Sequence, residues 1–166
     1  ALGRLGGAAL THASDLDLIF LFSGDHGAES DGERPLGATR YYNRLAARIV
    51  TALSVPTAAG PLYEVDTRLR PSGTQGPLAV TVESFYKYQR ESAWTWEHMA
   101  LTRARPVYGE PGLREQLQDQ IGAILRQSRE PEELRKAVRK MRLDIVEHKP
   151  PKGPLDTKLM EGGLVD

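Results

Sequence analysis

The sequence contains no cysteine, which excludes disulfide bonds and thiolate metal sites from its 166 residues. A chain without disulfides suits a reducing cytosol, so we expect a cytoplasmic protein. The sequence also lacks an apolar run long enough to cross a membrane and lacks a recognisable signal peptide, so we expect no membrane partner. Basic and acidic residues balance at 22 each, and the formal net charge of zero gives no indication of nucleic-acid binding.

Several catalytic and metal-binding patterns are missing as well. The sequence has no G-x-S-x-G nucleophile motif, no Walker-type lysine loop and no internal repeat. Its histidines do not have the spacing of metal ligands, which argues against a zinc site; they are His12, His26, His98 and His148. The length fits one domain or a domain and a half. The chain opens without methionine and stops at Asp166, three residues after a glycine pair, so we expect a piece of a longer polypeptide.

An Asp-x-Asp pair stands at the start of an apolar run. Asp15 and Asp17 precede residues 18–22, which are rich in strand-forming side chains. Because side chains alternate across a strand, both carboxylates point to the same side, and the pattern predicts an interior strand. Two such close carboxylates favour a cation between them, and oxygen ligands favour Mg²⁺ or Mn²⁺. The alternative is a pair of solvated acids at a turn.

A second stretch, residues 62–70, alternates in the same way. One side carries apolar and small residues, and the other carries Glu64, Asp66, Arg68 and Arg70. If this strand adjoins the first, Asp66 becomes a third carboxylate facing the pair, and Arg68 lies near any anion that the metal ions hold. An ordinary exposed strand would give the same alternation.

The remaining segments are predicted more simply. Residues 1–7 are glycine-rich and indicate the end of a strand entering a turn, which is either a phosphate-binding turn or a plain one. Residues 23–37 form a polar, glycine-rich loop. Both tryptophans fall within residues 94–96, where core packing is the commoner role. Apolar periodicity predicts helices over residues 38–53, 82–90, 113–125 and 134–145, followed by a linker over residues 149–154.

A glycine turn and three carboxylates flanked by arginines together fit a phosphoryl-transfer site. Three carboxylates can hold two Mg²⁺ ions about 3.5–4 Å apart, the arrangement used for in-line displacement at phosphorus. With these motifs the chain resembles the nucleotidyltransferase superfamily related to DNA polymerase β, and more closely the glutamine synthetase adenylyltransferase family. The segments that carry the resemblance are Gly3–Gly7, Ser14–Phe20, Tyr63–Pro71, Ala93–His98 and Thr102–Arg105. Residues 161–166 resemble the start of the helical region that follows each catalytic domain of the family.

The resemblance implies an α+β nucleotidyltransferase fold, with a short mixed sheet flanked by helices. It implies a catalytic domain over residues 1–109 and a helical extension over residues 110–166. The implied reaction transfers AMP from ATP to a tyrosine hydroxyl of glutamine synthetase, releases pyrophosphate and thereby regulates nitrogen assimilation. A nitrogen-signalling regulatory protein is the further partner that the family implies for the full-length enzyme.

The resemblance also implies residue roles. Asp15 and Asp17 bridge two Mg²⁺ ions, and Asp66 completes one site and positions or deprotonates the tyrosine. Five further residues are expected to bind ATP near its phosphates: Gly6, Gly7, Ser14, Arg68 and Arg70.

Three alternatives remain open. Family enzymes carry two related domains, and the Trp-Thr-Trp-Glu-His stretch at residues 94–98 resembles the adenylylating one. The sibling domain, which removes AMP by phosphorolysis, would use the same carboxylates. A regulatory module without catalysis is a second alternative. An Asp-x-Asp sugar transferase is a third, although it would not need Asp66.

Overall fold

The computed structural model describes residues 1–153, 156–160 and 162–163. The chain divides into two compact units. The first contains residues 1–93 and 97–126, and the second contains residues 94–96 and the chain from Gln127 onward. Within the described ranges, no helix combines the length and apolar character needed to cross a membrane. Residue 154 at the end of the predicted linker, residue 155 after it, and most of the predicted helical start at 161–166 lie outside the described residues.

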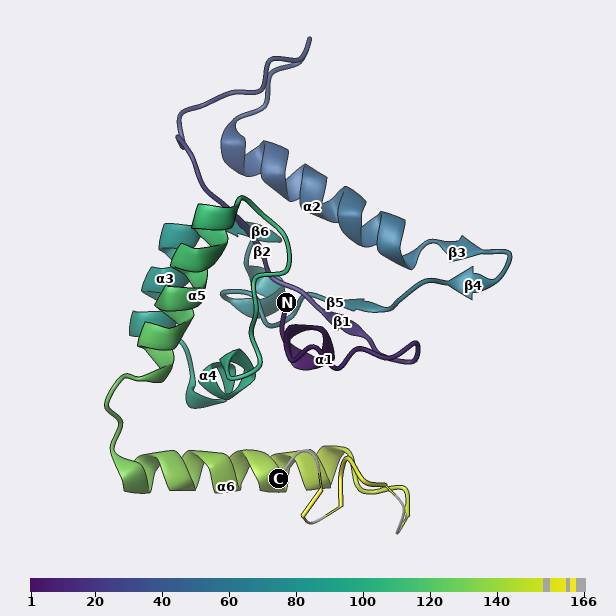
Figure 1. Ribbon diagram of the computed structural model, residues 1–166, viewed down its shortest axis with the longest axis vertical. Helices are drawn as coiled ribbons and strands as arrows, with labels where there is room; N and C mark the ends of the chain where they lie inside the picture. The colour runs from purple at the N-terminus through teal and green to yellow at the C-terminus, as the bar shows by residue number, and fades with distance from the viewer. Residues whose placement is uncertain (154–155, 161, 164–166) are drawn as a thin grey trace. The chain divides into compact units, whose positions relative to one another are not determined.

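Short strands make up the β-structure of the first unit. Strand β1 (Leu16–Asp17) pairs in parallel with β5 (Val65–Asp66), and β2 (Phe20–Phe22) pairs in parallel with β6 (Ala79–Thr81). A small antiparallel hairpin joins β3 (Pro56–Thr57) to β4 (Gly60–Pro61) (Figure 1). Together with the helices, these strands confirm the α+β class.

The strands are shorter than the sequence predicted. The single strand predicted from the Asp-x-Asp pair to residue 22 is divided into β1 and β2, because the two segments pair with different partners, β5 and β6. The predicted strand over residues 62–70 contains regular pairing only at Val65–Asp66. After Asp66 the chain turns, and the Arg70 N–H donates to the Thr67 carbonyl at 3.3 Å.

Helices of the first unit follow the apolar periodicity closely. They are α2 (Ala38–Ser54), α3 (Val82–Glu91) and α5 (Pro111–Leu125). Thr81 caps the start of helix α3, and its hydroxyl accepts from the Ser84 N–H; a 3₁₀ turn, η1 (Gly73–Gln75), precedes β6. Helix α4 (Thr95–Leu101) contains Trp96 and directly follows Trp94; both side chains are exposed, so the expectation of core packing for the tryptophans is wrong. In the second unit, α6 (Pro131–His148) confirms the last predicted helix.

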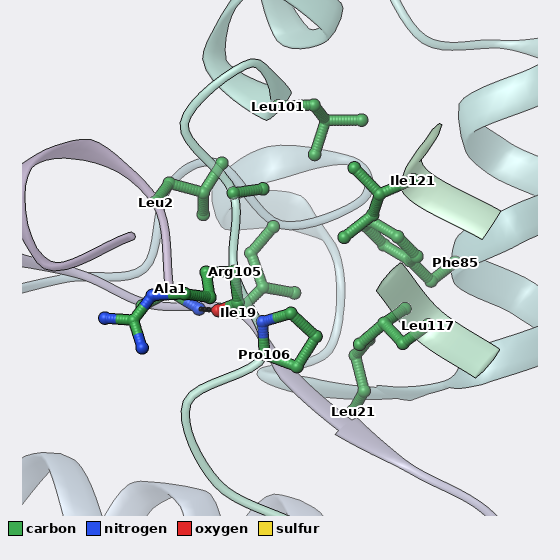
Figure 2. A pocket seen from close by; sticks show the side chains of 11 residues that line it. Ala1, Leu2, Ile19, Leu21, Phe85, Leu101, Arg105, Pro106, Leu117 and Ile121 are labelled. Carbon is green, nitrogen blue, oxygen red and sulfur yellow. Dashed lines mark hydrogen bonds between the residues drawn. The ribbon is translucent and has the colours of Figure 1, made fainter. Parts of the chain in front are cut away.

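The core of the first unit lies between the strands and helices α3 and α5. Its buried members are Leu2, Val80, Phe85, Leu101 and Ile124. Figure 2 shows Leu2, Phe85 and Leu101 directed toward a small cavity of about 40 Å³. A second cluster of Phe22, Ala46 and Ala79 packs α2 onto β2 and β6. These two clusters hold β1, β2 and their partner strands in place.

The N-terminal segment is anchored beside β1, but not as a strand. Ala1 exchanges two hydrogen bonds with the Arg105 backbone at 2.8 and 2.9 Å, one of which is drawn in Figure 2. The prediction of a strand end over residues 1–7 is wrong in form, because Gly3 has φ +55° and starts the short helix α1 (Gly3–Gly6). The Arg105 guanidinium donates to the carbonyls of Leu5 and Gly6 and so satisfies the end of this helix.

Candidate active site

Two of the predicted acids, Asp17 and Asp66, come together on the paired strands β1 and β5, and the third, Asp15, directly precedes β1. The parallel register places Leu16 opposite Val65 and Asp17 opposite Asp66. Leu16 is buried, so the side chain of Asp17, the other residue of β1, lies on the opposite face of the strand. Because Asp66 is paired with Asp17, its side chain lies on the same face of the paired strands as that of Asp17. The expectation that the two strands adjoin is therefore confirmed.

The backbone of β1 is fixed from both sides. Toward β5, the Leu16 and Leu18 N–H groups donate to the carbonyls of Glu64 and Asp66, both at 2.8 Å. From the N-terminal segment, the Leu2 N–H donates to the Asp17 carbonyl at 2.9 Å. The backbone of Asp17 is thus held between the turn at the start of the chain and strand β5.

Gly3 lies against the Asp17 carboxylate. A Cβ atom at this position would lie 2.0 Å from Asp17 Oδ2, well inside van der Waals contact. Gly3 also has φ +55°, a conformation that L-residues other than glycine avoid. The first glycine of the N-terminal turn is therefore the one on which the position of Asp17 depends. Gly3 was not among the predicted site residues, although its place in the Gly3–Gly7 motif was the available signal in the sequence.

Arg68 supplies the positive charge at the acidic cluster. Its Nε lies 3.0 and 2.9 Å from Asp66 Oδ1 and Oδ2, and its Nη2 forms an ion pair with Oδ2. These hydrogen bonds, followed by the charges of Asp66, Asp17 and Asp15, raise the pKa of Arg68 above its ordinary value. One guanidinium thus interacts electrostatically with all three predicted carboxylates.

The donor set has the chemistry that a hard divalent cation requires. Asp15 is exposed, while Asp17 and Asp66 are half-buried, so oxygen atoms can be reached from solvent. Carboxylate oxygens are the ligands that Mg²⁺ prefers, and the Arg68 guanidinium already stands beside them as a cation. Over residues 1–153, 156–160 and 162–163, no three acidic or histidine side chains are arranged as a ready-made metal site. The metal role of the three acids remains a prediction.

Four of the residues predicted to bind phosphate make contacts within the protein that stabilise its turns. Ser14 is buried, and its hydroxyl bonds to the N–H and hydroxyl of Thr11. A Cβ on Gly6 would lie 1.9 Å from the Arg103 carbonyl, so Gly6 permits close packing there, and Gly7 follows it at the end of α1. The Arg70 guanidinium donates to the Thr67 carbonyl at 2.9 Å and to Gly76 at 3.3 Å. These contacts stabilise the turns beside the acids, and phosphate binding by these residues remains a prediction.

A buried polar contact supports the turn that follows Asp66 and Arg68. The Tyr88 hydroxyl donates to the Glu97 carboxylate at 3.0 and 3.1 Å, and Glu97 is only 5% exposed. Burial and then the bond to Glu97 raise the pKa of Tyr88, while a hydrogen bond from the Ser72 backbone opposes the rise. The sequence carries no periodic signal for the pairing of Tyr88 with Glu97.

Comparison with known proteins shows the family of the chain. The model of the family described as glutamate-ammonia ligase adenylyltransferase matches residues 1–121. The chain belongs to this family. It is similar to proteins named bifunctional glutamine synthetase adenylyltransferase/adenylyl-removing enzyme, with 52% identity to that of Brucella melitensis over 167 aligned residues. The corresponding identities are 47% for Mesorhizobium japonicum and 45% for Idiomarina loihiensis, each over 166 residues.

These alignments include 99–100% of this chain but only 17–18% of each relative, so the chain spans about a sixth of their length. Membership of the glutamate-ammonia ligase adenylyltransferase family confirms the resemblance drawn from the motifs. The region matched by the family model contains every predicted site residue and ends inside α5.

Proposed function

We propose that this chain carries an adenylyltransferase site that transfers AMP from ATP to a tyrosine hydroxyl of glutamine synthetase and releases pyrophosphate. The observation that carries the proposal is the in-register pairing of Asp17 with Asp66, with Arg68 interacting with both and with Asp15. The names of the relatives supply the substrate and the reaction class. A nitrogen-signalling partner stays a prediction from the family resemblance.

The roles follow from position. Asp17 on β1 and Asp15 directly before this strand would hold two Mg²⁺ ions, and Asp66 would share one of them. Bound Mg²⁺ would neutralise phosphate charge and lower the pKa of the attacking hydroxyl. Asp66 also lies where a carboxylate could orient the incoming tyrosine or accept its proton. Arg68, whose side chain is 74% exposed, can contribute its charge to the triphosphate.

The test uses unmodified glutamine synthetase, labelled ATP and Mg²⁺, and it measures label incorporated into glutamine synthetase. We expect incorporation with the wild-type chain and loss of at least 100-fold, on the order of an essential metal ligand, with Asp17→Asn. Asp31→Asn, which removes an exposed acid from the loop before α2, is the matched control and should leave the rate unchanged. Equal incorporation by wild type and Asp17→Asn would contradict the proposal.

The sibling reaction is tested in parallel. Adenylylated glutamine synthetase and inorganic phosphate replace the first substrates, and release of ADP is measured. The tryptophan stretch of α4 favours the adenylylating domain, so we expect little ADP. ADP release without AMP incorporation would assign the chain to the adenylyl-removing reaction, and neither product would favour a module without catalysis.

A further inference from the structure

Arg68 holds the Asp66 carboxylate with its backbone and its side chain together. The Arg68 N–H donates to Asp66 Oδ1 at 2.8 Å, and Nε approaches both carboxylate oxygens at 3.0 and 2.9 Å. Nη2 adds an ion pair to Oδ2. The carboxylate that the proposed function assigns to the metal and to the tyrosine is therefore already engaged by a cation of the chain itself.

This engagement competes with metal binding. A guanidinium fork directed at both oxygens occupies the lone pairs that a divalent ion would use, and its charge repels a second cation. The Arg68 guanidinium can also leave the carboxylate. The Arg68 side chain is 74% exposed, whereas the Asp66 side chain is 21% exposed, so the arginine can rotate toward solvent while the acid stays in place. Fixing a long arginine side chain costs conformational entropy, which further favours its release when another partner is offered.

We propose that Arg68 is an internal counter-cation that suppresses metal binding at Asp66 until nucleotide arrives. This inference rests on the proposed function and adds an order of events to it. Without nucleotide, Arg68 neutralises Asp66. When ATP brings its phosphates, Arg68 moves from the carboxylate to the anionic triphosphate, and Asp66 becomes available to the metal ion. Arg68 is thus a positioning residue that couples metal binding to nucleotide binding.

The experiment measures Mn²⁺ affinity by electron paramagnetic resonance, with and without a non-hydrolysable ATP analogue, on the 166-residue chain. Signal lost in Asp17→Asn defines the site. Without nucleotide, Arg68→Gln should bind Mn²⁺ on the order of tenfold more tightly than wild type, the scale of a change in a ligand's neighbour. Arg68→Lys, which keeps the charge and loses the fork, should fall between them. Arg40→Gln, an exposed arginine of α2, matches the charge change and should behave as wild type.

With the ATP analogue, the affinities of wild type and Arg68→Gln for Mn²⁺ should converge, because Arg68 has then left Asp66 in the wild type. Equal affinities without nucleotide, or weaker binding by Arg68→Gln, would overturn the inference. If AMP transfer to glutamine synthetase is observed at the same time, the proposed function survives that result. Absence of Mn²⁺ binding in every variant, with and without nucleotide, would overturn both together.

Discussion

Replacing Gly3 with alanine tests whether the N-terminal turn positions the Asp17 carboxylate. The change has two costs that can be separated. The first is conformational, because φ +55° at Gly3 costs an L-residue about 1–2 kcal/mol of folding free energy. The second is steric, because the new Cβ would lie 2.0 Å from Asp17 Oδ2 and 3.1 Å from its Cγ. The carboxylate must move, since the Leu2–Asp17 backbone bond holds the turn against β1.

Gly73 provides the matched control. It has φ +53°, nearly the same conformation, but a Cβ there would meet only the Arg68 carbonyl at 3.6 Å, an ordinary contact. Gly73→Ala therefore carries the conformational cost without the clash. Urea denaturation of both variants should show losses of about 1–2 kcal/mol in the free energy of unfolding from the backbone alone.

Metal affinity separates the two variants. Displacing a ligand through its supporting neighbour typically weakens metal binding by about 10–100-fold, and we expect this loss of Mn²⁺ affinity in Gly3→Ala only. Gly73→Ala should bind Mn²⁺ as wild type does once both proteins are folded. Wild-type Mn²⁺ affinity in Gly3→Ala, in a folded protein, would refute the link between Gly3 and Asp17. Wild-type Mn²⁺ affinity in Asp17→Asn would in addition refute the metal role of Asp17.

Three further predictions concern the scaffold. Because burial and Glu97 raise the pKa of Tyr88, its neutral form stabilises the fold below its ordinary value of 10.0, and this stability is lost as the pH rises through the higher folded-state pKa. Urea titrations across alkaline pH should show this loss in wild type and not in Tyr88→Phe. Thr81→Ala removes the cap of α3 and should cost about 1 kcal/mol by thermal or urea unfolding, whereas Thr81→Ser should keep most of the stability. Asn43→Ala leaves two N–H groups at the start of β6 without the amide oxygen that accepts from both, and should cost about 1–3 kcal/mol; an unchanged midpoint would show that solvent replaces it.

Helices were predictable because their signal is local. The apolar residues of α2 recur every four positions, at Tyr41, Leu45, Ile49 and Leu53, and the structure places the helix within a residue of the predicted limits. Strand limits were not predictable in this way. Alternation continues through Arg70, but pairing stops at Asp66, because the chain then turns and the Arg70 side chain bonds back to Thr67.

The candidate site shows the same division. Alternation along each strand predicted that Asp15 and Asp17 share a face and that Asp66 faces them, and the pairing of β1 with β5 confirms that the strands adjoin. The contributions of Gly3 and of the Tyr88–Glu97 pair depend on contacts between residues distant in sequence or on the handedness of a turn. Neither leaves a periodic pattern. The engagement of Asp66 by Arg68 also escaped prediction, because alternation places both residues on one side without indicating that they pair.

The position of the acids depends finally on an apolar residue. Leu16 is 5% exposed and lies opposite Val65, and this register sets Asp17 opposite Asp66. A slip of one residue in β5 would turn Asp66 to the face occupied by Leu16 and set Val65 beside Asp17. The slip would also bury a carboxylate against the core, which is strongly unfavourable without a partner. Burial of Leu16 and exclusion of charge from the core therefore select the same register, and the carboxylates of Asp17 and Asp66 are brought together by the packing on the opposite face of the strands.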